Sequence, residues 1–84
     1  MRTMKELNAY LSEISGGRLE IFHGRGYFWF RQSEKEFSSG AGKESPESIY
    51  VCYIKNQSKE AWKLDLERAV KEYDDQEFPG RYEA

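Results

Sequence analysis

The first apolar pattern along the chain has the spacing of a helix. Its large apolar residues recur every three or four positions, so that they lie on one helical face. They are Leu7, Tyr10, Leu11 and Ile14. Thr3, with Glu6 three residues later, is typical of a capping box, and Gly16-Gly17 suits the left-handed conformation that ends many helices. We therefore predict a helix over residues 4–15.

The next pattern alternates with a period of two, which is typical of strands. Residues 18–23 and 27–31 are joined by Gly24-Arg25-Gly26, a tight turn signal, and together they predict a hairpin. One face of this hairpin would carry Leu19, Ile21, Phe28 and Phe30. The other face would carry Glu20, Phe22, Tyr27, Trp29 and Arg31.

The second half of the chain predicts a loop, a strand and a helix. Residues 33–48 are polar and have no regular period, which predicts a loop. Residues 48–54 would be apolar on both faces of a strand, as in a strand that is covered on both sides. The face of this third strand that points inward stays open. Ser58 is a good N-cap, and helical spacing follows over residues 59–74. The apolar residues of this helix are Trp62, Leu66, Ala69, Val70 and Tyr73.

These elements predict an α+β fold in the order α-β-β-β-α, with a three-stranded antiparallel sheet and two helices packed on one of its faces. A chain of 84 residues suits one domain, which we place at residues 1–78. We expect residues 79–84 to form a flexible tail, because they begin with Pro79-Gly80, which breaks the acidic stretch at the end of the sequence.

Composition narrows the classes of function. Charged residues make up 33% of the chain, and no apolar run approaches the roughly 20 residues that span a bilayer, so we expect a cytoplasmic protein without a membrane partner. The net charge is -2, without the basic stripe typical of nucleic-acid binders. Cys52 is the one cysteine, and its apolar surroundings predict a buried core thiol in a reducing compartment.

Catalytic and metal-binding patterns are weak. One histidine and one cysteine without paired ligands do not suit a zinc site, and we expect no metal, no cofactor and no small-molecule substrate. Gly24-Arg25-Gly26 and Gly40-Ala41-Gly42-Lys43 each lack the spacing of a phosphate-binding loop. His23 and Cys52 are an alternative as a nucleophile–base pair. Our prediction is that the chain is not an enzyme.

The aromatic face of the hairpin is the most informative feature. If two helices cover one face, the other displays Phe22, Tyr27, Trp29 and Arg31, together with a tyrosine of the third strand. Trp, Tyr and Arg are enriched at binding hot spots, which predicts a protein partner or a homodimer. The same rings could instead bind single-stranded nucleic acid, although no RNP motif is present. A third interpretation is that Phe37, the long loop or the tail covers the rings within one protomer.

Three short motifs resemble a type of small phage- and prophage-encoded α+β protein. They are Gly26-Tyr27-Phe28-Trp29-Phe30, Ser48-Ile49-Tyr50-Val51, and a terminal helix with Trp62 near its start. The resemblance covers residues 26–62, about half of the chain. It implies a phage or mobile-element origin and transfers no activity and no functional residue. It suits an adaptor or inhibitor that binds host machinery.

Overall fold

A computed structural model describes residues 1–34 and 43–76 of the chain. Its described elements are helix α1 (Met4–Ser15), strands β1 (Leu19–His23) and β2 (Phe28–Gln32), a short 3-10 helix (Ile54–Asn56) and helix α3 (Lys59–Asp74). The fold is α+β, as predicted. The predicted tail and residues 35–42 of the predicted loop lie outside the described residues, and the domain boundary at residue 78 stays a prediction.

Both helices have the predicted bounds because local signals set their ends. The Thr3 hydroxyl accepts a hydrogen bond from the Glu6 N–H at 3.1 Å, and the Glu6 side chain accepts one from the Thr3 N–H, which completes the capping box. Gly16 ends α1 in the left-handed conformation, with φ of 66°. The Ser58 hydroxyl caps α3 by accepting from the Ala61 N–H at 3.1 Å.

Strands β1 and β2 form the predicted antiparallel hairpin, with Phe22 opposite Trp29 and Glu20 opposite Arg31. Its turn is closed by a hydrogen bond of 2.8 Å from the Gly24 N–H to the Tyr27 carbonyl oxygen. Gly26, with φ of 79°, supplies the positive φ that this turn requires.

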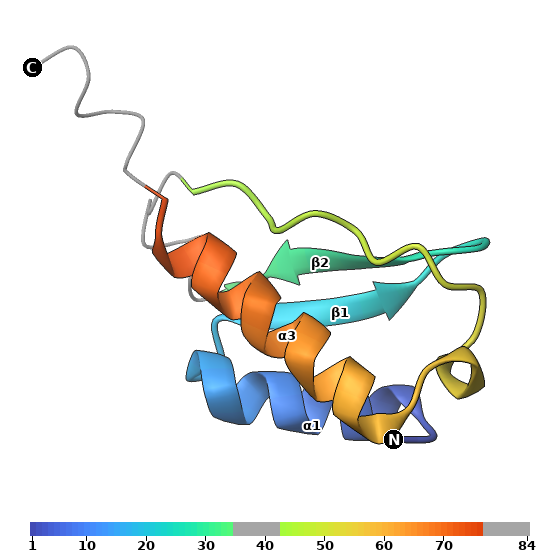
Figure 1. Ribbon diagram of the computed structural model, residues 1–84. Coiled ribbons are helices and arrows are strands. Elements are labelled where there is room, and N and C mark those ends of the chain that lie inside the picture. Colours follow the sequence, from blue (N-terminus) through green and yellow to red (C-terminus); the bar gives the residue numbers. More distant parts are fainter. Residues whose placement is uncertain (35–42, 77–84) are drawn as a thin grey trace, which may run out of the picture.

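Helices α1 and α3 lie on one face of the hairpin (Figure 1). The core between the helices and the sheet contains the predicted inward side chains of all four elements: Leu7, Leu11, Leu19, Ile21, Phe28, Phe30, Trp62, Leu66, Ala69, Val70 and Tyr73, with Ile49 beside them. The Trp62 ring meets the Phe28 ring edge-on at 5.0 Å, and its indole N–H donates to the Ile54 carbonyl oxygen at 2.8 Å. The predicted placement of two helices on one face is thus confirmed.

The predicted third strand is the main correction to the fold. Among the described residues the sheet has two strands, and the segment predicted as the third makes a single antiparallel bridge, Ile49 to Phe28. After Ile49 the Val51 N–H donates to the Ile49 carbonyl oxygen at 3.1 Å in a three-residue turn, and the chain bends at residues 52–53.

Before Ile49, the described residues 43–48 bond to α3 and to Gln76, just beyond its end. The Glu47 N–H donates to a Glu72 carboxylate oxygen at 3.0 Å. Glu44 exchanges two hydrogen bonds with the Gln76 side chain, at 2.7 Å through its N–H and 2.6 Å through its carbonyl oxygen. Residues 43–48 therefore run beside β2 without joining its ladder (Figure 1).

Candidate functional site

The face of the hairpin opposite the helices carries the predicted site residues. We call it the open face and define it as Glu20, Phe22, Tyr27, Trp29 and Arg31. Burial alternates along both strands, with buried side chains toward the core and half-buried or exposed ones toward the open face. Within residues 1–34 and 43–76, no helix or strand packs over it. The two-residue period of the sequence therefore predicted these faces correctly.

Three of the predicted residues form one stacked column. The Phe22 and Trp29 rings are stacked, with centroids 4.7 Å apart and planes 25° from parallel. The guanidinium carbon of Arg31 lies 4.8 Å from the centroid of the Phe22 ring. Such stacking adds to the stability of cross-strand pairs and holds the rings in a defined orientation. The stacking therefore holds Trp29, Phe22 and Arg31 in one arrangement.

Glu20 completes the polar end of this column. Its carboxylate lies 3.3 Å from an Arg31 guanidinium nitrogen, and both side chains are substantially exposed. An exposed ion pair of this kind contributes little to stability. Arg31 is 61% exposed and so keeps donors available to another molecule.

Tyr27 lies apart from the column, at the tip of the hairpin. Its ring packs over Gly24, where an added Cβ would come within 2.6 Å of Tyr27 Cζ. The ring centroid is 6.2 Å from that of Tyr50, which is 79% exposed. The structure thus extends the aromatic surface from the hairpin to the chain beyond the Ile49 bridge.

The sequence left open whether Tyr50 or Tyr53 would be exposed beside the aromatic residues of the hairpin. Both are exposed, whereas Ile49 is buried and Val51 is half-buried against the core. The apolar run of residues 48–54 contains no sign of which face points inward, because both of its faces are apolar. The pairing of Ile49 with Phe28 decides it, since burial then alternates from Ile49 to Cys52.

The prediction of a buried thiol at Cys52 is wrong, since the side chain is exposed. The short turn after Ile49 takes it out of the sheet. His23 does approach this residue, but its Nε2 lies 2.6 Å from the Cys52 carbonyl oxygen. Because a carbonyl can only accept, Nε2 carries the hydrogen. The His23 ring also stacks on the Phe28 ring at 4.1 Å, while the residue as a whole is exposed.

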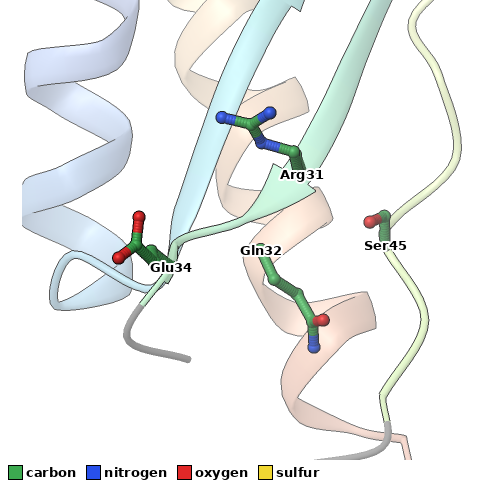
Figure 2. Close-up of a pocket in the computed structure, with 4 residues that line it drawn as sticks. All are labelled: Arg31, Gln32, Glu34 and Ser45. Carbon is green, nitrogen blue, oxygen red and sulfur yellow. The ribbon is translucent and has the colours of Figure 1, made fainter. Parts of the chain in front are cut away.

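A cavity of about 470 Å³ adjoins the open face at the end of β2. Arg31, Gln32 and Glu34 line it from β2 and the residues that follow, and Ser45 lines it from the segment opposite (Figure 2). Gln32 also donates a hydrogen bond of 2.8 Å to the hydroxyl of Tyr73, which is fully buried. The cavity marks the place where residues 43–48 separate from β2.

Neither a metal-ligand cluster nor a membrane-spanning helix occurs among the described residues. In the part of the chain that the structure describes, no three His, Cys, Asp or Glu side chains are grouped as metal ligands. Neither α1 nor α3, the helices within residues 1–34 and 43–76, has the length and apolar character needed to cross a bilayer.

Comparison with known proteins adds no relative. No protein-family model, no curated protein and no solved structure matches this chain.

Proposed function

We propose that this protein is a small protein-binding module whose open face contacts a protein partner. The observation that supports the proposal is the stacked column of Trp29, Phe22 and Arg31 on the face opposite the helices. Its residue types are those enriched at binding hot spots, and its order limits the entropy lost on binding. An adaptor or inhibitor of phage origin, working in the cytoplasm by occupying a partner's surface, would use such a face without any catalytic group.

A homodimer through the open face is the closest alternative within this class. A twofold contact would stack one column against its copy, with Glu20 and Arg31 free to pair across the interface. Sizing of the purified protein over a range of concentrations separates the two forms of the proposal.

The proposal is tested with the double substitution Trp29→Ala and Tyr27→Ala. The matched control is Leu64→Ala, since Leu64 is 67% exposed on α3, away from the open face. Proteins retained from the native cell extract on the immobilised wild-type chain would be identified and then measured singly by calorimetry. We expect the double variant to fold and to lose at least about tenfold in affinity, while Leu64→Ala binds as the wild type does. Unchanged binding or unchanged dimerisation by the folded double variant would exclude the open face.

A second function, the binding of single-stranded nucleic acid, has one observation in its favour. Stacked rings beside an arginine are also the platform on which successive bases stack. Titration of a fluorescent oligonucleotide at several salt concentrations discriminates, because phosphate contacts make affinity fall steeply with salt. The net charge of -2 supports the protein partner over the nucleic acid.

A further inference from the structure

The hydrogen-bonding directions of β2 divide its residues into two sets. In an antiparallel hairpin, alternate residues point both backbone groups toward the neighbouring strand. The bonds Gly24 N–H to Tyr27 oxygen and Ser33 N–H to Arg18 oxygen, both 2.8 Å, show that the odd-numbered residues 27 and 33 face β1. With the observed register, residues 28, 30 and 32 therefore point their backbone groups away from β1.

The first of these outward residues is paired. Phe28 and Ile49 exchange two hydrogen bonds of 2.8 Å each. If that register continued, Glu47 would lie opposite Phe30 and Ser45 opposite Gln32. The continuation does not form, because the backbone of the segment is bonded to Glu72 of α3 and to Gln76, which lies just beyond the end of that helix.

Within residues 1–34 and 43–76, the edge of β2 is therefore unpaired at Phe30 and Gln32. Among the described residues, neither backbone has a hydrogen-bond partner on this side. The cavity of about 470 Å³ lies along this edge, with Gln32 on one wall and Ser45 on the other (Figure 2). Unpaired groups at a sheet edge form a template for an added strand, which is a common mode of peptide recognition.

We propose that the edge of β2 at Phe30 and Gln32 receives an extended segment of the protein partner, with an acidic side chain beside Arg31. This inference rests on the proposed function and specifies how the partner is held. Backbone bonds to Phe30 and Gln32 would supply affinity, and side chains of the added segment would extend the open face. Cross-strand neighbours of opposite charge are favourable. Arg31 reaches over β1, where it pairs with Glu20, but it is 61% exposed and lines the cavity beside this edge.

Charge argues against a second copy of the chain as the occupant. Two copies of β2 that pair Phe30 of each with Gln32 of the other would place Arg31 directly opposite its own copy, and like charges in that position are destabilising. Glu34 lines the cavity beyond the end of β2, so a segment with acidic residues along its whole length is also disfavoured.

The first part of the test needs no ligand. Amide hydrogen exchange of the whole chain, followed by NMR, should show a protected Phe28 amide and markedly faster exchange at Phe30 and Gln32. Protection at Phe30 and Gln32 equal to that at Phe28 would mean that the edge is already paired and would overturn the inference. Protection that grows with protein concentration would indicate a second copy and would overturn it as well.

The second part uses a displayed library of random seven-residue peptides as the probe. We expect enriched peptides to contain strand-favouring residues around an acidic one, and the best of them, once synthesised, to slow exchange at Phe30 and Gln32. Arg31→Glu should weaken its binding about tenfold or more, whereas Arg25→Glu, the same change at the exposed hairpin tip, should leave it within about twofold.

The outcomes separate this inference from the function on which it rests. Peptides whose binding requires Trp29 and Tyr27 but does not slow amide exchange at Phe30 and Gln32 would overturn the proposal of strand addition at the β2 edge. The same result would support binding through the open face. A library that yields no enriched peptide would overturn strand addition at the β2 edge. Binding through the open face would still be tested by the affinity of the Trp29→Ala and Tyr27→Ala double variant for its partner.

Discussion

At the scale of single residues, the two tryptophans show how position decides the role of one side chain. Trp62 has no exposed surface, donates to the Ile54 carbonyl oxygen and meets Phe28 edge-on. Trp29 is half-buried on the open face and is held by Phe22. Both rings are part of ordered contacts, but only Trp62 lies in the core.

Truncating each tryptophan should therefore have very different costs. We expect Trp62→Ala to lower the free energy of unfolding by about 3–5 kcal/mol, because it leaves a cavity in the core. We expect Trp29→Ala to lower it by about 1 kcal/mol, since a half-buried ring loses less burial and leaves no cavity. Chemical denaturation of both variants measures the difference. Equal losses would mean that Trp29 belongs to the core and would weaken its assignment to a binding surface.

At the scale of elements, the missing third strand is the feature that governs the surface of this protein. Residues 48–54 have the composition of a strand, and Ile49 does pair with Phe28. A three-residue turn follows Ile49, and the Glu47 N–H before it donates a hydrogen bond to Glu72 of α3. The outcome leaves Tyr50 exposed and, within the part of the chain that the structure describes, the edge of β2 unpaired at Phe30 and Gln32.

Glu72 tests this explanation, because its carboxylate accepts the Glu47 N–H. Glu72→Ala should cost about 1 kcal/mol of unfolding free energy, whereas Glu72→Gln retains an acceptor oxygen and should cost less. Thermal and denaturant unfolding of the two variants provide the comparison. Exchange of the Glu47 amide should be faster in Glu72→Ala than in Glu72→Gln, and equal rates in the two would contradict the role of α3.

At the scale of the whole molecule, side-chain pairs join the end of α3 to the rest of the chain. Arg18, which precedes β1, forms a bidentate ion pair with Asp74, the last residue of α3. The Tyr10 hydroxyl of α1 donates to the Glu67 carboxylate of α3, and this bond raises the pKa of Tyr10. Hydrogen bonds from Arg18 lower the pKa of the Asp74 carboxyl.

The lowered pKa of Asp74 predicts the acid side of the stability profile. Folding favours the ionised carboxyl, so the contribution of the pair is present above the unfolded pKa near 3.8 and is lost as the pH falls through the lower folded pKa. Asp74→Asn should remove this part of the pH dependence. The loss at neutral pH should be no more than about 1 kcal/mol, because both side chains are partly exposed.

Denaturant unfolding between pH 2 and pH 7 measures this effect. Arg18→Met should flatten the acid limb in the same way as Asp74→Asn, and the double variant should add nothing further. An acid limb that is unchanged in Asp74→Asn would show that other carboxyls produce the acid dependence.

The sequence by itself determined the features that depend on near neighbours. The caps at Thr3, Gly16 and Ser58 are local, and they place both ends of α1 and the start of α3 where the structure has them. The two-residue period of the hairpin assigned Phe22, Trp29 and Arg31 to one face, because side chains of a strand must alternate.

Tertiary structure alone decided whether residues 43–54 would extend the sheet. Their backbone could bond to β2 or to acceptors on α3, and the choice depends on where Glu72 and Gln76 lie after the chain has folded. No local pattern encodes that competition between acceptors distant in sequence. The exposure of Tyr50 and Cys52, the cavity beside Gln32 and the free edge at Phe30 follow from its result.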